Sequence, residues 1–107
     1  MLEQMLQSRL PEQATHNIIY FTASWCGPCN ALQLDRLVAQ HPHVRWYICD
    51  VDNDHYLPGY CGVRTVPSFL GIVHGKATPL HSGADLVAIA KWMIQHVSVP
   101  RAVIQTK

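Results

Sequence analysis

One short stretch decides how the rest of the chain is interpreted: Ser24-Trp25-Cys26-Gly27-Pro28-Cys29-Asn30. Residues 17–23 precede it, and this uncharged run of β-branched and aromatic side chains is typical of a strand buried on both faces. Apolar residues at helical spacing follow it up to about Gln40. The two cysteines therefore lie where a buried strand is expected to turn into a long helix.

The spacing of Cys26 and Cys29 predicts thiol–disulfide chemistry. At the start of a helix, unpaired amide N–H groups and the positive end of the helix dipole would favour the thiolate form of Cys26. Cys29 would lie about one turn further along, within reach of a disulfide and more deeply buried. Gly27 and Pro28 permit the sharp turn and preset the backbone of an early helical position. We expect Cys26 to attack and Cys29 to resolve.

Metal binding is the alternative interpretation of this spacing, because a Cys-x-x-Cys pair is also half of a zinc site. The other two cysteines, Cys49 and Cys61, form no second Cys-x-x-Cys pair, and the seven histidines include no His-x-x-x-His pattern. A junction between a strand and a helix also suits redox chemistry better than a structural zinc site. We therefore expect no metal.

Length and composition restrict the class of protein. With 107 residues and 12.0 kDa, the chain is expected to form one domain. An apolar fraction of 49% against 14% charged residues argues against disorder, and a net charge of +1 gives no reason to expect a nucleic-acid partner. No apolar run reaches the roughly 18 residues of a membrane helix. With no recognisable secretory signal and only four cysteines, we expect a cytoplasmic protein.

Hydrophobic periodicity predicts alternating helices and strands. The strands at 17–23 and 44–50 are linked by a helix and should be parallel, whereas those at 66–73 and 77–81 form a hairpin and should be antiparallel. The first two expected helices cover residues 2–10 and the segment from the cysteines to about Gln40. A short helix capped by Asp52 or Asn53 is expected before Pro58-Gly59, and a last one from Ser82 or Gly83 to about His96. The apolar side of the last helix is marked by Ala84, Val87, Ala88, Trp92 and Ile94.

Four segments of the sequence resemble the thioredoxin family, and the expected order of helices and strands fits that family too. Trp25-Cys26-Gly27-Pro28-Cys29 matches the family's active-site motif, and Thr65-Val66-Pro67 stands where the family has its cis-proline loop. Asp50-Val51-Asp52 matches its acidic strand end, and Ser82-Gly83-Ala84 its Gly-Ala loop. The resemblance covers about residues 2–98. It implies an α/β thioredoxin fold, with a mixed four-stranded or five-stranded sheet flanked by helices on both faces, in a domain of residues 1–99 followed by a tail at 100–107.

The resemblance also implies an activity, that of a protein-disulfide reductase. The Cys26 thiolate would attack a substrate disulfide, and Cys29 would then release the reduced substrate by forming a Cys26–Cys29 disulfide. Thioredoxin reductase would recycle that disulfide, and no bound cofactor is needed. The substrate would contact a flat apolar surface, with the backbone of Val66 offered to an extended segment. That surface comprises Trp25, Gly27, Pro28, Val66, Pro67, Gly83 and Ala84.

Two other functions stay open on the sequence. A glutaredoxin-like enzyme would hold glutathione with the backbone near Pro67 and Gly83 and with the Asp85 carboxylate. A thioredoxin-fold subunit of a larger complex would bind a partner without turnover. The full Cys26–Cys29 motif favours the reductase over both.

Two replacements distinguish the chain from the family pattern near the cysteines. Tyr20 occupies the position six residues before Cys26, where the family has a buried aspartate, and that aspartate's lysine partner would fall near Ile48. We therefore expect a neutral core below the cysteines, with Cys29 deprotonated by water, the Cys26 thiolate or Tyr20. Asn30 follows the motif where lysine or arginine is common, which removes a positive charge near Cys26.

The family's first strand has no counterpart in the sequence, so residues 44–50 are expected to have an unpaired edge. We expect a monomer with a four-stranded sheet, and the alternatives are pairing of that edge with residues 102–104 or with a second copy of the chain. Cys49 is expected to be a core residue. Cys61, in a loop before Thr65, is a candidate regulatory thiol.

Overall fold

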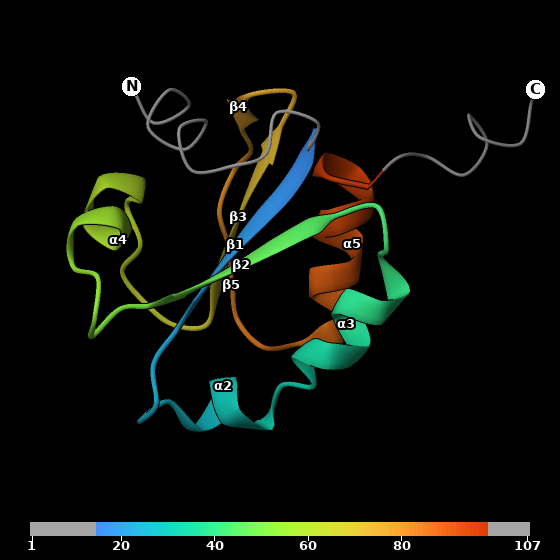
Figure 1. Ribbon diagram of the computed structural model, residues 1–107. Coiled ribbons are helices and arrows are strands. Elements are labelled where there is room, and N and C mark those ends of the chain that lie inside the picture. The colour runs from blue at the N-terminus through green and yellow to red at the C-terminus, as the bar shows by residue number, and fades with distance from the viewer. Residues whose placement is uncertain (1–14, 99–107) are drawn as a thin grey trace, which may run out of the picture.

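The sheet is organised around β1 (His16–Thr22), whose five central residues are all buried. In the computed structural model, which describes residues 15–98, β1 lies parallel to β2 (Arg45–Asp50) and antiparallel to β3 (Ser68–Val73), as expected (Figure 1). Two short strands, β4 (Lys76–Ala77) and β5 (His81–Ser82), pair with the other edge of β3. Within residues 15–98, β2 pairs with β1 alone and forms an edge of the sheet.

Three sequence predictions fall outside the described residues. They are the helix at 2–10, the pairing of residues 102–104 with the edge of β2, and the domain limits of 1–99 with a tail at 100–107. Each of them stays a prediction.

The single strand expected at 77–81 is divided into β4 and β5. The Gly71 N–H donates to the Thr78 hydroxyl, 3.0 Å away, while the Thr78 N–H donates to the Gly71 carbonyl. Pro79 follows and has no N–H to offer to the ladder. Regular pairing with β3 therefore stops after Ala77 and resumes at His81.

The prediction of one long helix after the cysteines is wrong. The segment forms two helices, α2 (Gly27–Ala31) and α3 (Leu34–Gln40). Leu32, at the break, has extended backbone angles, with φ −72° and ψ 129°. Both Leu32 and Leu34 pack against the core. In an unbroken helix these two side chains would point about 200° apart, so only one of them could face the core. The break allows both to pack there.

α4 (Tyr56–Cys61) continues through Pro58 and Gly59, where the sequence predicted that it would end. Pro58 lies in the first helical turn, where a missing N–H costs no helical hydrogen bond. His55, and not Asp52 or Asn53, occupies the N-cap position and makes no side-chain capping hydrogen bond. Asp54, one residue earlier, accepts the Leu57 N–H on its Oδ1 at 3.1 Å.

α5 (Leu86–His96) begins after the N-cap Asp85, four residues later than the earlier of the two predicted starts. The Asp85 carboxylate accepts the Val87 N–H at 3.2 Å. Its buried side carries Ile89, Trp92 and Met93. Val87 and Ile94, which we placed on the apolar side, are 63% and 67% exposed. Trp92, which we also place on that side, is buried. The helix has apolar residues on more than one side, so periodicity alone identified its buried side only in part.

The two faces of the sheet carry separate halves of the core. Figure 1 shows α3 and α5 on one face and α4 on the other. On the face covered by α3 and α5, the core includes Ile18 and Phe69 of the sheet with Ile89 and Met93 of α5. On the face covered by α4, it includes Phe21, Leu70 and Ile72 of the sheet with Leu57 of α4. The expected mixed sheet with helices on both faces is confirmed. None of the helices in the described part of the chain has the length and apolar character needed to cross a bilayer.

The close packing at Gly71 gives a test of this fold. A Cβ at position 71 would lie 2.8 Å from Val97 Cγ2 and 2.9 Å from Thr78 Cγ2, and both neighbours are stiff β-branched side chains. We expect Gly71→Ala to reduce the free energy of unfolding by about 1–3 kcal/mol, as overpacking does. Urea-induced unfolding measures this change.

Gly59→Ala is the matched control, since a Cβ there meets nothing within 4 Å. Because Gly59 lies inside α4, this variant should gain up to about 1 kcal/mol. Equal stabilities of the Gly71 and Gly59 variants would contradict the packing described here.

Candidate active site

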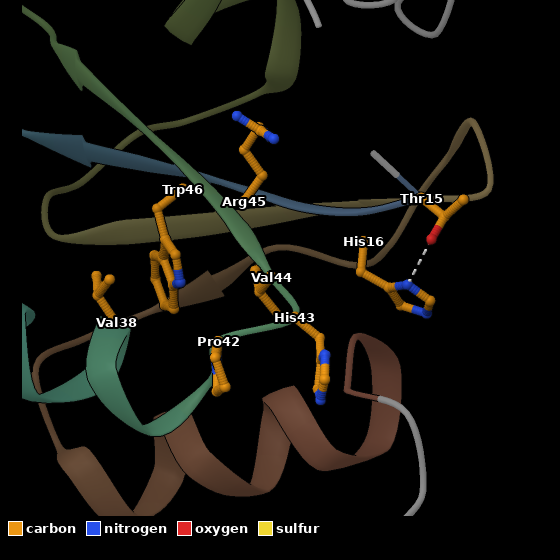
Figure 2. Close-up of a pocket in the computed structure, with 8 residues that line it drawn as sticks. All are labelled: Thr15, His16, Val38, Pro42, His43, Val44, Arg45 and Trp46. Atoms are coloured by element: carbon orange, nitrogen blue, oxygen red, sulfur yellow. Dashed lines mark hydrogen bonds between the residues drawn. The ribbon is translucent and has the colours of Figure 1, made fainter. Parts of the chain in front are cut away.

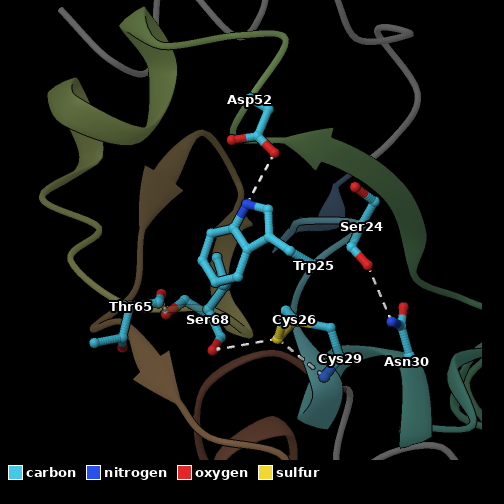
Figure 3. The surroundings of a disulfide bond; sticks show 9 residues. Ser24, Trp25, Cys26, Cys29, Asn30, Asp52, Thr65 and Ser68 are labelled. Atoms are coloured by element: carbon cyan, nitrogen blue, oxygen red, sulfur yellow. Dashed lines mark hydrogen bonds between the residues drawn. A yellow bond between two sulfur atoms is a disulfide. The ribbon is translucent and has the colours of Figure 1, made fainter.

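Cys26 and Cys29 are joined by a disulfide, with their Cα atoms 5.2 Å apart (Figure 3). Cys26 is the N-cap of α2, and its Sγ accepts the backbone N–H of Cys29 at 3.1 Å. Pro28 occupies an early helical position, as the sequence predicted. The same N–H would donate to a Cys26 thiolate after reduction, which favours the charged form of this sulfur.

Two other expectations for these cysteines need correction. Cys29 is not the more deeply buried residue, because Cys26 is 3% exposed and Cys29 is 6% exposed. Ala23, Val51 and Val66 cluster around both cysteines. In addition, α2 has only five residues, so its dipole is small. The support for a Cys26 thiolate is therefore the local Cys29 N–H and not a long helix.

The loop that precedes β3, which contains Val66 and Pro67, contacts the disulfide. The Val66 carbonyl oxygen lies 3.6 Å from Cys26 Sγ (Figure 3). The Val66–Pro67 peptide bond is cis. Val66 therefore presents its backbone immediately beside the sulfur that is expected to react.

The loop before α5 is tied to this same segment. The Gly83 N–H donates to the Pro67 carbonyl at 2.9 Å, and Gly83 adopts φ +116°, which suits glycine and few other residues. The Ser68 hydroxyl donates to the Thr65 carbonyl and also hydrogen-bonds the Ser82 hydroxyl at 2.9 Å. These contacts bring Gly83, and Ala84 after it, to the side of Val66-Pro67.

Trp25 is 68% exposed and is held by a residue that the sequence analysis did not assign to the site. Its Nε1–H donates to Asp52 Oδ2 at 2.9 Å (Figure 3). Asp52 is itself fixed, since its backbone N–H donates to Asp50 Oδ1 at 2.9 Å. The match of Asp50-Val51-Asp52 to the family was the available signal. The sequence offers Asp52 only as a candidate cap for the short helix before Pro58-Gly59.

Asn30 stabilises the loop in place of supplying a charge. Its side-chain Nδ2 donates to the Ser24 carbonyl at 3.1 Å. This contact closes the turn that carries both cysteines, since residues 25–29 lie between the two partners.

Tyr20 is not brought together with the cysteines. It is buried, and its ring stacks on Phe69 with ring centroids 5.0 Å apart. It belongs to the core cluster beneath α3 and α5, whereas Cys26 and Cys29 form a separate cluster. Its strand partner is Ile48, as the sequence register implied, and both side chains are uncharged. The contacts give Tyr20 a packing role, and its part in proton transfer stays a prediction.

Neither Cys49 nor Cys61 forms a disulfide, and both belong to the core cluster on the α4 side of the sheet. Cys49 is buried, and Cys61 is half-buried. Burial, with further contributions from Cys49 and Asp54, raises the pKa of Cys61 to about 11. Cys61 is therefore a protonated, weakly nucleophilic thiol near neutral pH, which weakens the prediction that it is regulatory.

A cavity of about 510 Å³ lies away from the disulfide, next to the start of β2. Figure 2 shows its lining, in which the Arg45 side chain points away from Trp46. The Trp46 Nε1–H is buried and has no hydrogen-bond partner within the described residues. Burial, then the neighbouring His74 and His43, lower the pKa of His16. None of the residues that we assigned to the site lines this cavity. Its lining comprises Thr15, His16, Val38, Pro42, His43, Val44, Arg45 and Trp46.

No group of three or more His, Cys, Asp or Glu side chains within residues 15–98 is arranged to hold a metal ion. The site offers the two sulfurs of Cys26 and Cys29, with the Cys29 N–H as donor and the Val66 carbonyl as acceptor beside Cys26.

Comparison with known proteins gives consistent matches. A family model described as Thioredoxin matches residues 2–95. Mitochondrial thioredoxin-3 of Saccharomyces cerevisiae is 36% identical over 76 residues, which cover 69% of this chain and 60% of that protein. A TPR repeat-containing thioredoxin of Arabidopsis thaliana is 34% identical over 83 residues, which cover 76% of this chain and 22% of that protein. The oxidised crystal structure of the yeast mitochondrial thioredoxin 3 has a TM-score of 0.77 at 31% identity, covering 86% of this chain and 89% of that one.

The chain belongs to the thioredoxin family. It spans less than two thirds of the length of the two curated relatives described above, 60% of one and 22% of the other. The described domain carries a Cys26–Cys29 disulfide at the position of the family's active-site motif.

The raised pKa of Cys61 gives a test by alkylation. Because a pKa of about 11 leaves only about 10⁻⁴ of this thiol as thiolate at pH 7, Cys61 should react slowly with iodoacetamide in the reduced, folded protein. The rate should rise about tenfold per pH unit between pH 7 and pH 10. Peptide mass spectrometry after timed quenching measures it, with the urea-unfolded protein as the control. Equal rates in the folded and unfolded protein at pH 7 would show that burial does not protect this thiol.

Proposed function

We propose that the protein is a protein-disulfide reductase in which Cys26 is the nucleophile and Cys29 the resolving cysteine. One observation carries the proposal: the Cys29 N–H donates to Cys26 Sγ, and the Val66 backbone lies against the same sulfur. The first contact favours a Cys26 thiolate, and the second positions a substrate beside it. Together they distinguish the two cysteines, although these are buried to a similar extent.

In the first step, the Cys26 thiolate attacks one sulfur of a substrate disulfide. A Cys26–substrate disulfide forms, the substrate S–S bond breaks, and the second substrate sulfur leaves as a thiolate that takes up a proton from water. The Cys29 N–H stabilises the thiolate before attack. The exposed ring of Trp25, held by Asp52, would form one wall of the approach.

In the second step, Cys29 loses its proton and attacks Cys26 Sγ. The Cys26–Cys29 bond forms, the bond to the substrate breaks, and two electrons have passed to the substrate. The proton of Cys29 passes to water or to the leaving substrate thiolate. A part for Tyr20, whose ring packs in another cluster, stays a prediction. The product is the disulfide form that the structure describes.

The substrate would bind across the surface formed by Trp25, Gly27, Pro28, Val66, Pro67, Gly83 and Ala84. The support for this is the set of hydrogen bonds that joins Gly83 to Pro67 and the segment from 65 to 68 to Ser82. An extended substrate segment would pair with the backbone of Val66, as in strand addition.

We further propose that thioredoxin reductase returns electrons to the Cys26–Cys29 disulfide, without a bound cofactor, and that the protein acts in the cytoplasm as a monomer. Cys49 and Cys61 form no disulfide, which suits a reducing compartment. The glutathione-dependent alternative requires the Asp85 carboxylate, which already caps α5 by accepting the Val87 N–H. An edge-to-edge dimer through β2 is the alternative oligomeric state.

Trapping of the intermediate tests the assigned roles. We expect Cys29→Ser to accumulate a covalent complex with insulin, a disulfide-containing protein, because the first step proceeds and the second cannot. Cys26→Ser should form none. Non-reducing electrophoresis and mass spectrometry measure the complex, which must disappear with dithiothreitol. Accumulation on Cys26→Ser, with none on Cys29→Ser, would reverse the assigned roles.

Reduction of insulin by the wild-type protein tests the electron donor. The wild-type protein should reduce insulin continuously with NADPH and thioredoxin reductase, and at least about tenfold more slowly with NADPH, glutathione and glutathione reductase. Faster turnover with glutathione would favour the glutaredoxin-like alternative.

A further inference from the structure

An apolar cavity lies between α3 and α5, outside the surface assigned to the substrate. It has a volume of about 220 Å³ and is lined by Leu37, Leu86, Val87 and Ala90, together with the exposed side chains of Arg36 and Gln40. Leu37 is buried and belongs to the core beneath these two helices. Figure 1 shows α3 and α5 packed side by side at this place. Because apolar cavities of about 150 Å³ accommodate a benzene ring, this one can take an apolar side chain.

The cavity opens beside exposed apolar residues that contribute nothing to the described core. Leu86 is 40% exposed and Val87 is 63% exposed, and both stand in the first turn of α5. Their exposure is unfavourable in water, at about 25 cal/mol per Å² of apolar surface. No other segment of residues 15–98 covers them. An apolar surface of this kind marks an interaction site when it joins another interface.

This cavity lies close in the chain to the surface assigned to the substrate. The Gly83 N–H is bonded to the Pro67 carbonyl, and Val66, before Pro67, contacts Cys26 Sγ. Leu86, which lines the cavity, follows Gly83 by three residues and so lies within about 11 Å of it. A protein bound across the surface at Gly83 would therefore have residues within reach of the cavity.

We propose that the cavity between α3 and α5 is a second binding site for disulfide-containing substrate proteins, which takes an apolar side chain of the substrate near the disulfide. The proposal rests on the proposed function, the reduction of protein disulfides. The substrate side chain packs on Leu37 and Ala90, and Val87 closes over it. A small disulfide without a polypeptide reaches Cys26 and leaves the cavity empty. The cavity thus distinguishes proteins from small disulfides.

The test compares two substrates, insulin and the uncharged small molecule bis(2-hydroxyethyl) disulfide. In Val87→Glu, a carboxylate blocks the mouth of the cavity, at a helical position where an acidic residue is compatible with the helix dipole. We expect kcat/KM for insulin to fall about tenfold, mainly through a higher KM, which corresponds to the loss of one buried aliphatic side chain. Val87→Leu, which keeps the surface apolar, should retain the wild-type kcat/KM for insulin.

Ile94→Glu is the matched control, because Ile94 is 67% exposed on the same helix and does not line the cavity. It should retain the wild-type kcat/KM for insulin. An equal fall for insulin in Ile94→Glu and Val87→Glu, or no fall in either, would overturn the second site. The rate of the wild-type protein with the small disulfide separates these results from a failure of the proposed function, since a protein without disulfide reductase activity would reduce neither substrate.

Two further measurements address other occupants of the cavity. If a second copy of the chain filled it, Val87→Glu would lower the mass in sedimentation equilibrium. If the chain covered its own cavity, Val87→Glu would lower the melting temperature by several degrees more than Ile94→Glu. Either result would overturn the proposal, which predicts an unchanged mass and similar melting temperatures for the two variants.

Discussion

The antiparallel pairing of β1 with β3 is the constraint on which the site depends. Its register places Phe21 opposite Ser68, so the chain leaving β1 and the chain entering β3 meet at the same end of the sheet. Cys26 and Val66 consequently come within 3.6 Å of each other, although 40 residues separate them. The pairing of β5 with β3 brings a third segment to this end of the sheet. Ser82 lies opposite Ser68, and the Gly83 N–H donates to the Pro67 carbonyl.

Within that frame, a single backbone donor distinguishes two sulfurs of similar burial. The Cys29 N–H points at Cys26 Sγ because Cys26 caps α2, and capping requires its non-helical backbone. The chain thus needs neither a long helix nor a charged core residue to favour a Cys26 thiolate. This agrees with the replacement of the family's charged pair by Tyr20 and Ile48, which the register places opposite each other.

The sequence was sufficient where a local pattern controls the structure. β1, β2 and β3 and the paired cysteines follow from runs of β-branched residues and from a motif of five residues. It was insufficient where packing between distant segments decides. The break at Leu32 allows Leu32 and Leu34 to pack against the same core. The hydrogen bond from Trp25 to Asp52 joins residues that are 27 positions apart in the sequence. The buried stripe of α5 also depends on the sheet beneath it, so Val87 was assigned to the core although it is exposed beside the cavity.

The central claim is that Cys26 and Cys29 form the reducing couple of a protein-disulfide reductase. The most direct measurement is the reduction potential of this disulfide, obtained by equilibrating the protein with dithiothreitol buffers and quantifying both forms after alkylation. We predict a value near −270 mV, which is about that typical of thioredoxins. A potential above about −180 mV, in the range of disulfide isomerases and oxidases, would contradict the claim.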